Sequence, residues 1–180
     1  MKLRDLLARH EPRAPLRYSV KAGLGALIAI LILGVLLDST GLPLLLAPFG
    51  ASTVLLFGRP RGTLAQPVNV VAGYTVSALV AYGVAQIFPG VLWATGASIG
   101  LSLVLMRVLR VTHPPAGAIP LIAFGDTLDV LELLEAVILG SVILVAIALV
   151  WHRIPPQQEY PKKGDADAWR RNPLEDTWDE

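Results

Sequence analysis

The chain has 180 residues, of which 54% are hydrophobic and 16% charged, and its mean hydropathy is +0.60. This composition is too apolar for an ordinary soluble domain, and the net charge of +1 gives no indication of nucleic-acid binding. The lack of cysteine excludes disulfides, thiol nucleophiles and thiolate metal sites. The sequence therefore indicates an all-α integral membrane protein with one membrane domain.

The predicted elements alternate between long and short apolar segments. Residues 1–18 are basic and are expected to form an N-terminal arm. Four long helices are predicted at about 19–37, 67–87, 91–106 and 131–151, each near the roughly 20 residues that span a bilayer. Two shorter elements, at about 42–57 and 114–124, are interrupted by proline. The membrane domain thus covers 19–153, and the polar residues 154–180 are expected to be a disordered tail.

The two short elements repeat each other. PFGASTVLLFG at 48–58 and PAGAIPLIAFG at 115–125 share five residues at identical spacing, displaced by 67 positions. Paired Pro/Gly-interrupted segments in two halves of a chain are typical of the binding site of a secondary transporter. The same displacement places Gly73 of the third segment on Gly140 of the last. The chain therefore divides into repeats at about 19–87 and 90–153.

The charges of the loops predict the topology. If both short elements cross the membrane, every loop Lys and Arg falls on one side, which the positive-inside rule makes cytoplasmic. If both instead turn back, four loop arginines fall outside. Six crossings with both termini in the cytoplasm are favoured, and the membrane would be the cell inner membrane. Three crossings per repeat invert the second copy, which gives a three-plus-three inverted repeat.

The prolines indicate where a binding site would lie. Pro48 and Pro114-Pro115 favour half-helices that begin there, after extended backbone. A helix N-terminus offers free N–H groups and partial positive charge, which favour an anion. The candidate substrate-binding residues are Phe49, Gly50, Ala51, Ser52, Thr53, Asn69, Thr112, His113, Ala116, Gly117 and Ala118. Alternatively, the small residues only allow close helix packing.

Ionisable residues near the membrane breaks offer a second kind of contact. His113 is a candidate for substrate contact or for proton coupling, since histidine titrates near neutral pH, or else it is an interface residue. Arg107 and Arg110 are topology markers, and Arg110 is the better candidate for a ligand. The three histidines lie far apart in sequence, without carboxylates at ligand spacing, so no metal site is expected. No catalytic or nucleotide-binding motif occurs, so neither an enzyme nor a cofactor is expected.

The stretch Thr112-His-Pro-Pro-Ala-Gly-Ala118 resembles the signature of the HPP family of small bacterial and plastid membrane proteins, named for that tripeptide. The segment APFGASTVLLFG at 47–58, followed by LAQP at 64–67 and Asn69, is similar to the other signature of the family. The resemblance covers about 16–152. It implies membrane transport, with nitrite transport assigned to plant members.

These observations predict a transporter or channel for a small anion, with nitrite the first candidate, bound at facing half-helix N-termini near the bilayer midplane. Membrane lipid is the expected surrounding, proton coupling and a homo-oligomer are compatible with the sequence, and nucleic acid is not an expected partner. The alternative is a non-transporting membrane scaffold or partner subunit, with the tail from Pro155 as its docking segment.

Overall fold

A computed structural model describes residue 8 and residues 13–125 and 129–163. Every regular element in these ranges is helical, which confirms an all-α protein. The α-helices are α2 (Leu16–Thr40), α3 (Ala47–Gly58), α4 (Pro67–Ile87), α5 (Leu92–Val108), α6 (Ile119–Ala123) and α7 (Val130–Trp151). Two 3-10 helices, η1 (Thr63–Ala65) and η2 (Pro114–Ala118), precede α4 and α6.

Within the described ranges, three helices rather than the expected four are long and apolar enough to cross a membrane: α2, α4 and α7. The helix α5 has 17 residues and falls short of this length. The two short elements occur where the repeat places them, at α3 and at η2 followed by α6. The second of them is not one regular half-helix, because its first turns are a 3-10 helix.

Local sequence sets the helix boundaries. Pro67 stands in the first turn of α4, where its missing N–H costs nothing. The helix α2 ends at Gly41, whose left-handed backbone (φ 73°) lets its N–H donate to the carbonyl of Leu37 over 2.8 Å. The carboxylate of Asp129 accepts the N–H of Leu131 over 2.8 Å and caps α7.

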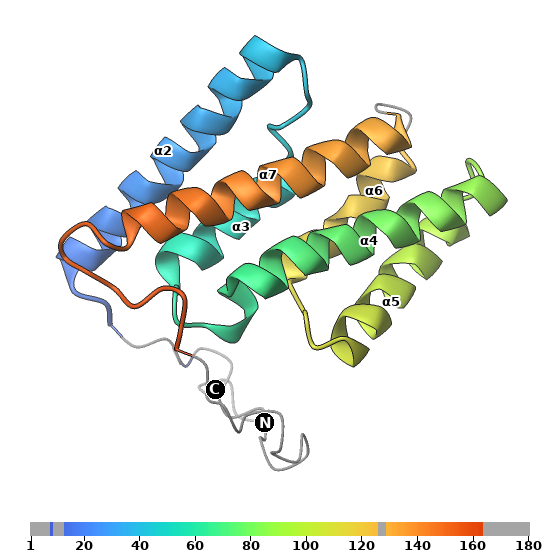
Figure 1. Cartoon of the computed structure of the whole chain (residues 1–180). Helices are drawn as coiled ribbons and strands as arrows, with labels where there is room; N and C mark the ends of the chain where they lie inside the picture. Colours follow the sequence, from blue (N-terminus) through green and yellow to red (C-terminus); the bar gives the residue numbers. More distant parts are fainter. Residues whose placement is uncertain (1–7, 9–12, 126–128, 164–180) are drawn as a thin grey trace.

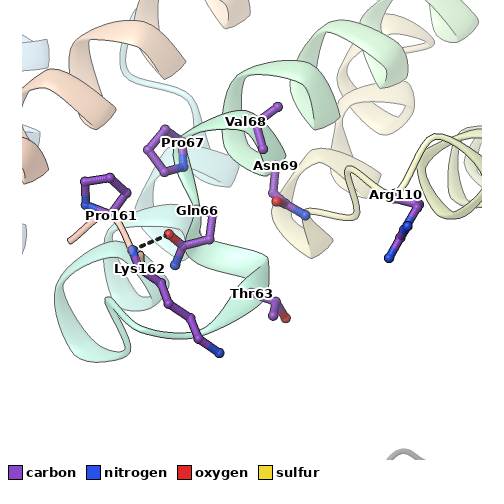
Figure 2. A pocket seen from close by; sticks show the side chains of 8 residues that line it. All are labelled: Thr63, Gln66, Pro67, Val68, Asn69, Arg110, Pro161 and Lys162. Carbon is purple, nitrogen blue, oxygen red and sulfur yellow. Dashed lines mark hydrogen bonds between the residues drawn. The ribbon is translucent and has the colours of Figure 1, made fainter. Parts of the chain in front are cut away.

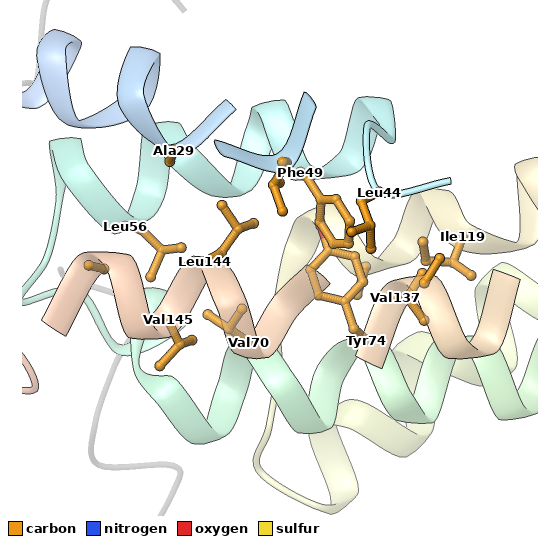
Figure 3. Close-up of a cluster of buried hydrophobic side chains, with 14 of the residues drawn as sticks. Ala29, Leu44, Phe49, Leu56, Val70, Tyr74, Ile119, Val137, Leu144 and Val145 are labelled. Atoms are coloured by element: carbon orange, nitrogen blue, oxygen red, sulfur yellow. The ribbon is translucent and has the colours of Figure 1, made fainter. Parts of the chain in front are cut away.

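The helices α4 and α7 pack together at the centre of the bundle, with α5 and α6 on α4 and with α2 and α3 on the other side (Figure 1). Buried side chains from α3, α4 and α7 fill the space between them, with Phe49, Val70, Tyr74, Leu144 and others in one cluster (Figure 3). The outer face of α2 exposes large apolar side chains, including Leu27, Leu31 and Val35. Such a face suits a lipid environment.

Basic side chains gather at one end of the bundle, which we call the basic end. It comprises the start of α2, the loop from α3 to α4, the end of α5 and the segment after α7, with Arg13, Arg17, Lys21, Arg59, Arg61, Arg107, Arg110, Arg153 and Lys162. The opposite end holds Asp38, Asp129 and Glu132. The charge separation noted in the sequence is therefore also a separation in space.

The expectation of a disordered tail is wrong for residues 154–163. Residues 154–163 pack across the basic end, because buried groups there find partners in this segment. The ammonium of Lys21 donates to the carbonyls of Ile154 and Pro156 over 2.6 and 2.8 Å. The hydroxyl of Tyr160, whose side chain is buried, donates to the carbonyl of Ala65 over 3.1 Å. Residues 164–180 lie outside the described residues, as does most of the N-terminal arm.

Candidate functional site

Three fully buried side chains form a hydrogen-bonded chain in the middle of the bundle. Ser52 Oγ lies 2.8 Å from His113 Nε2 and 2.8 Å from Tyr74 Oη. His113 Nδ1 lies 2.8 Å from the carbonyl oxygen of Leu64. The side chains come from α3, from α4 and from the residue before η2, so the chain connects three elements. We call Tyr74, Ser52 and His113 the polar triad.

The partners fix the direction of these hydrogen bonds. The Leu64 carbonyl can only accept, so His113 Nδ1 carries a hydrogen and donates it. In the neutral ring Nε2 then accepts from the Ser52 hydroxyl, which in turn accepts from Tyr74. Each of these four groups thus has a partner, which is the condition for burying polar groups at little cost.

Backbone features place the triad. Pro114 and Pro115 hold His113 in extended conformation (φ −136°, ψ 101°) at the cap of η2. Gly73 leaves space for the histidine, since a Cβ at Gly73 would lie 2.8 Å from His113 Cβ and 3.0 Å from the Val111 carbonyl oxygen.

An aromatic contact joins the beginnings of the two short elements. The rings of Phe49, in the first turn of α3, and Tyr74 lie 5.1 Å apart in an edge-to-face arrangement. The rings of Tyr74 and His113 lie 5.3 Å apart. Both short elements therefore begin at the same tyrosine. They run from it in opposite directions, α3 toward the basic end and α6 away from it (Figure 1).

The predicted site residues separate into two groups. Phe49, Ser52 and His113 meet at Tyr74, and Asn69 lies next to them, because its side-chain amide donates to the carbonyl of Thr112 over 3.1 Å. The remaining candidates do not point into this centre. Thr53 Oγ1 donates within α3 to the Gly50 carbonyl over 2.7 Å, Ala51 is exposed, Ala116 is buried, and Gly117 and Ala118 are half-buried.

Main-chain N–H groups at the starts of the two short elements, which were expected to be free for an anion, are in part already engaged. The N–H of Phe49 donates to the Leu46 carbonyl over 2.9 Å, and that of Ala116 donates to the His113 carbonyl over 3.0 Å. Each of these hydrogen bonds joins residues three positions apart, as in a 3-10 turn, and uses an N–H group that an α-helix would leave free at its start. A Cβ at Gly50 or Gly117 would meet no atom within 4 Å, so neither glycine is needed there for a close approach to a neighbouring helix.

Sequence reasoning did not place Tyr74 or the Leu64 carbonyl in the site. The available signal for Tyr74 was a tyrosine inside an apolar helix, directly after the repeated Gly73. A buried tyrosine hydroxyl needs a hydrogen-bond partner, and a serine hydroxyl such as that of Ser52 can supply it. The carbonyl of Leu64 carries no sequence signal, since any residue supplies one. Among the described residues no group of three His, Asp or Glu side chains could hold a metal ion.

A cavity of about 550 Å³ lies at the basic end, beside the triad (Figure 2). Thr63, Gln66, Pro67, Val68, Asn69, Arg110, Pro161 and Lys162 line it. Thr63 and Gln66 flank Leu64 and Ala65, whose carbonyls accept from His113 and Tyr160. Lys162 is held by its N–H, which donates to the side-chain oxygen of Gln66 over 2.8 Å.

The family model described as "HPP, transmembrane region" matches residues 11–161, which is most of the chain. The chain belongs to the HPP family. Two curated transmembrane proteins of Dictyostelium discoideum are similar to it, with 30% and 32% identity over 125 residues. Each alignment covers 65% of this chain but only 44% and 40% of those proteins, so the chain spans less than half their length. No solved structure matches it.

In this HPP chain the His-Pro-Pro stretch has a definite structural part. Its histidine joins the polar triad, and its prolines begin η2. The match to the family also extends to residue 161 and so includes the packed segment after α7, with Tyr160. The described helices and the family together make this a membrane protein.

Proposed function

We propose that this HPP protein is a transporter or channel for a small anion, with nitrite as the first candidate. The observation that carries the proposal is the polar triad, buried between two short helices that begin together and run apart in a largely apolar bundle. Hydrogen-bonded polar groups inside a membrane are retained where a solute or proton passes. Interrupted helices that meet at mid-depth are the usual sites of solute binding.

Reciprocal contacts support the inverted repeat. In the first repeat Gly73 of α4 packs against His113, at the start of the second short element. In the second repeat its equivalent, Gly140 of α7, packs against the ring of Phe49, at the start of the first short element. Each repeat thus contributes the glycine that receives the short element of the other. Such exchange is expected for two copies related by an approximate two-fold axis.

An anion is favoured by the charges at the basic end. Among the described residues that line the cavity beside the triad, Arg110 and Lys162 are basic and none is acidic. Nitrite itself is suggested by the resemblance to plant HPP proteins. With the basic end in the cytoplasm, both termini are cytoplasmic in the cell inner membrane, as the positive-inside rule favours.

Proton coupling is a further part of the proposal. When His113 Nε2 gains a proton, it donates to Ser52, and the Ser52 hydroxyl turns to donate to Tyr74. Protonation therefore reverses the direction of both hydrogen bonds in the polar triad. Moving a proton together with the anion would remove the cost of about 2.3 kcal/mol per 100 mV for carrying a negative charge against the membrane potential.

Uptake into proteoliposomes tests the function. The purified chain should take up nitrite in preference to nitrate, formate or chloride, and an inward proton gradient should accelerate it. Ser52→Ala should reduce the uptake, whereas Ser39→Ala, at the exposed end of α2, should not. His113→Gln should leave a flux that no longer responds to the proton gradient. Absence of uptake of all four anions above empty liposomes rejects the proposal.

The alternative function, a scaffold with the tail from Pro155 as docking segment, has less support. Up to residue 163 that segment is packed on the chain itself through Tyr160 and Lys162.

A further inference from the structure

Residues 154–163, which we call the strap, run from the end of α7 across the basic end of the bundle (Figure 1). The first part of the strap is held by α2. The ammonium of Lys21, whose side chain is buried, donates to the carbonyls of Ile154 and Pro156 over 2.6 and 2.8 Å. Hydrogen bonds from a charged donor are stronger than those between neutral groups. The strap therefore begins at a fixed place beside α2.

The second part of the strap is held by η1 and by the residue that follows η1. The hydroxyl of Tyr160 donates to the carbonyl of Ala65 over 3.1 Å, and both residues are buried. The N–H of Lys162 donates to the side-chain oxygen of Gln66 over 2.8 Å (Figure 2). The side-chain nitrogen of Gln66 donates in turn to two carbonyls of the loop from α3 to α4. This glutamine therefore joins the strap to that loop.

The turn η1 also holds the polar triad. The carbonyl of Leu64 accepts from His113 Nδ1 over 2.8 Å, and the next carbonyl along the chain, that of Ala65, accepts from Tyr160. Two adjacent carbonyls thus bind the histidine of the triad and the tyrosine of the strap. Each peptide unit is planar, so only φ and ψ of Ala65 lie between the two carbonyl groups. A rotation of one carbonyl is therefore transmitted to the other.

The burial of these groups gives the connection a direction. A buried carbonyl that loses its donor is costly, so the Ala65 carbonyl turns toward water when Tyr160 leaves it. This turn tilts the preceding peptide and weakens the bond from His113 to Leu64. In the neutral ring that bond keeps the hydrogen on Nδ1. Release of the strap therefore frees the histidine to place its hydrogen on Nε2 instead.

We propose that the strap controls the polar triad through η1, with Tyr160 as a positioning residue. With the strap closed, His113 is held in one tautomer and η1 is covered. With the strap released, η1 is uncovered and the ring exchanges between tautomers. The control of the triad rests on the contacts described above. As a control of anion uptake, the strap rests on the proposed function.

The test uses the full chain with Tyr160→Phe or Lys21→Met. Tyr160→Phe keeps the ring against His152 and removes only the hydroxyl. Lys21→Met removes the ammonium that holds the beginning of the strap and leaves the contacts of η1 in place, so its effect on the triad must pass through the strap. Tyr82→Phe, in the last part of α4, is the matched control.

Reaction of a buried thiol measures release of the strap. Ala65→Cys, at a position that is 1% exposed, is added to each protein, since the chain has no cysteine of its own. The rate of reaction with a water-soluble maleimide in dodecyl maltoside follows the fraction of time for which the site is open. Tyr160→Phe and Lys21→Met should each raise this rate by about threefold to tenfold, the effect of losing one hydrogen bond. A thiol from Ala81→Cys, buried farther along α4, should react equally in all proteins.

The histidine ring is measured in proteins without the added thiol. Nitrogen NMR of protein labelled at histidine distinguishes ring nitrogens that carry a hydrogen from those that do not, and His113→Gln identifies the signals of His113. We expect the hydrogen on Nδ1 in wild type and in Tyr82→Phe. Tyr160→Phe and Lys21→Met should shift both ring signals toward the other tautomer.

An unchanged thiol rate at position 65 in Tyr160→Phe, or unchanged ring signals of His113, overturns the proposal. An effect of Tyr160→Phe without one of Lys21→Met would show that the strap does not act as a unit, and would overturn it too.

Uptake into proteoliposomes is a separate measurement. Tyr160→Phe should lower the initial rate of anion uptake severalfold relative to Tyr82→Phe, and equal rates would overturn the control of uptake. Absence of uptake by wild type would reject the proposed function, whereas the thiol rates and the NMR signals, which do not involve transport, would still decide whether the strap controls the triad.

Discussion

Gly73 of α4 lies directly against His113, so close that a Cβ on the glycine would stand 2.8 Å from the Cβ of the histidine. The second obstacle is the main-chain oxygen of Val111 at 3.0 Å, which has no rotamer to move. The contact fixes the depth at which the extended residues before η2 cross α4. It therefore also fixes the position of the histidine ring relative to Ser52.

Gly73→Ala should destabilise the protein by about 1–3 kcal/mol, the cost of overpacking a well-filled interior. The matched control is Gly83→Ala in the same helix, where the new Cβ meets no atom within 4 Å. That change should be neutral or stabilising, since alanine is the better helix former. Thermal unfolding in detergent, followed by fluorescence-detected gel filtration, measures both. Equal midpoints for the two variants would contradict the close approach.

Gly140→Ala should be destabilising through the ring of Phe49, which occupies the place of the new methyl group. A smaller side chain at 49 relieves this, so Phe49→Leu should suppress part of the effect. In a double-mutant cycle the two changes together should cost less than the sum of the single changes, by about 0.5–3 kcal/mol. Additive costs would mean that the two residues do not touch.

The polar triad predicts unequal effects for its two hydroxyl groups. Ser52→Ala leaves His113 Nε2 buried without a donor and should cost about 1–3 kcal/mol. Tyr74→Phe removes only the first donor of the chain and keeps the ring between Phe49 and His113, so about 0.5–1.5 kcal/mol is expected. Chemical unfolding in mixed micelles measures both. A larger loss for Tyr74→Phe would show that the chain is connected differently.

Much of the fold follows from the sequence because its signals are local. Apolar length predicts α2, α4 and α7, and proline predicts where α3 and η2 begin. The residues of the polar triad, by contrast, come from distant parts of the sequence. Ser52 and His113 lie 61 positions apart, and their pairing depends on the way α3 packs against the residues before η2. A periodic pattern contains no information on such a contact.

The packed tail is a second case in which contacts between residues far apart in sequence could not be predicted. A polar, proline-containing segment has the composition of a disordered one. Residues 154–163 are nevertheless packed, because Lys21 and Ala65 offer a donor and an acceptor that lie far away in sequence. The burial of Tyr160 against the ring of His152, with centroids 5.3 Å apart, adds apolar contact that composition does not reveal.

Cysteine labelling can decide whether α3 crosses the membrane. The chain has no cysteine, so single substitutions give a clean background. Ser39→Cys stands before α3 and Arg61→Cys after it, and both positions are exposed. A membrane-impermeant maleimide applied to intact spheroplasts should label position 39, and it should label position 61 only after lysis. Arg153→Cys should behave like Arg61→Cys. Labelling of 39 and 61 from one side would reject the crossing and, with it, the inverted repeat.

The last prediction concerns His152 and acid. This histidine follows α7 at the basic end, is buried, and donates from Nε2 to the Leu56 carbonyl over 2.8 Å. Burial lowers the pKa of His152; the bond to Leu56 opposes this shift, and the ammonium of Lys21 adds to it. The ring of Tyr160 covers one side and carries no charge in this range.

A histidine whose pKa is lower in the folded than in the unfolded state binds its proton more readily after unfolding. Its contribution to stability is therefore complete above the unfolded value of about 6.5 and decreases as the pH falls below it. The thermal midpoint of wild type should accordingly fall between about pH 6.5 and pH 5. His152→Gln keeps an amide donor for Leu56 but cannot titrate, so its midpoint should vary less across this interval. An identical pH dependence in His152→Gln would assign the acid sensitivity to another group and would show that protonation of His152 does not oppose folding.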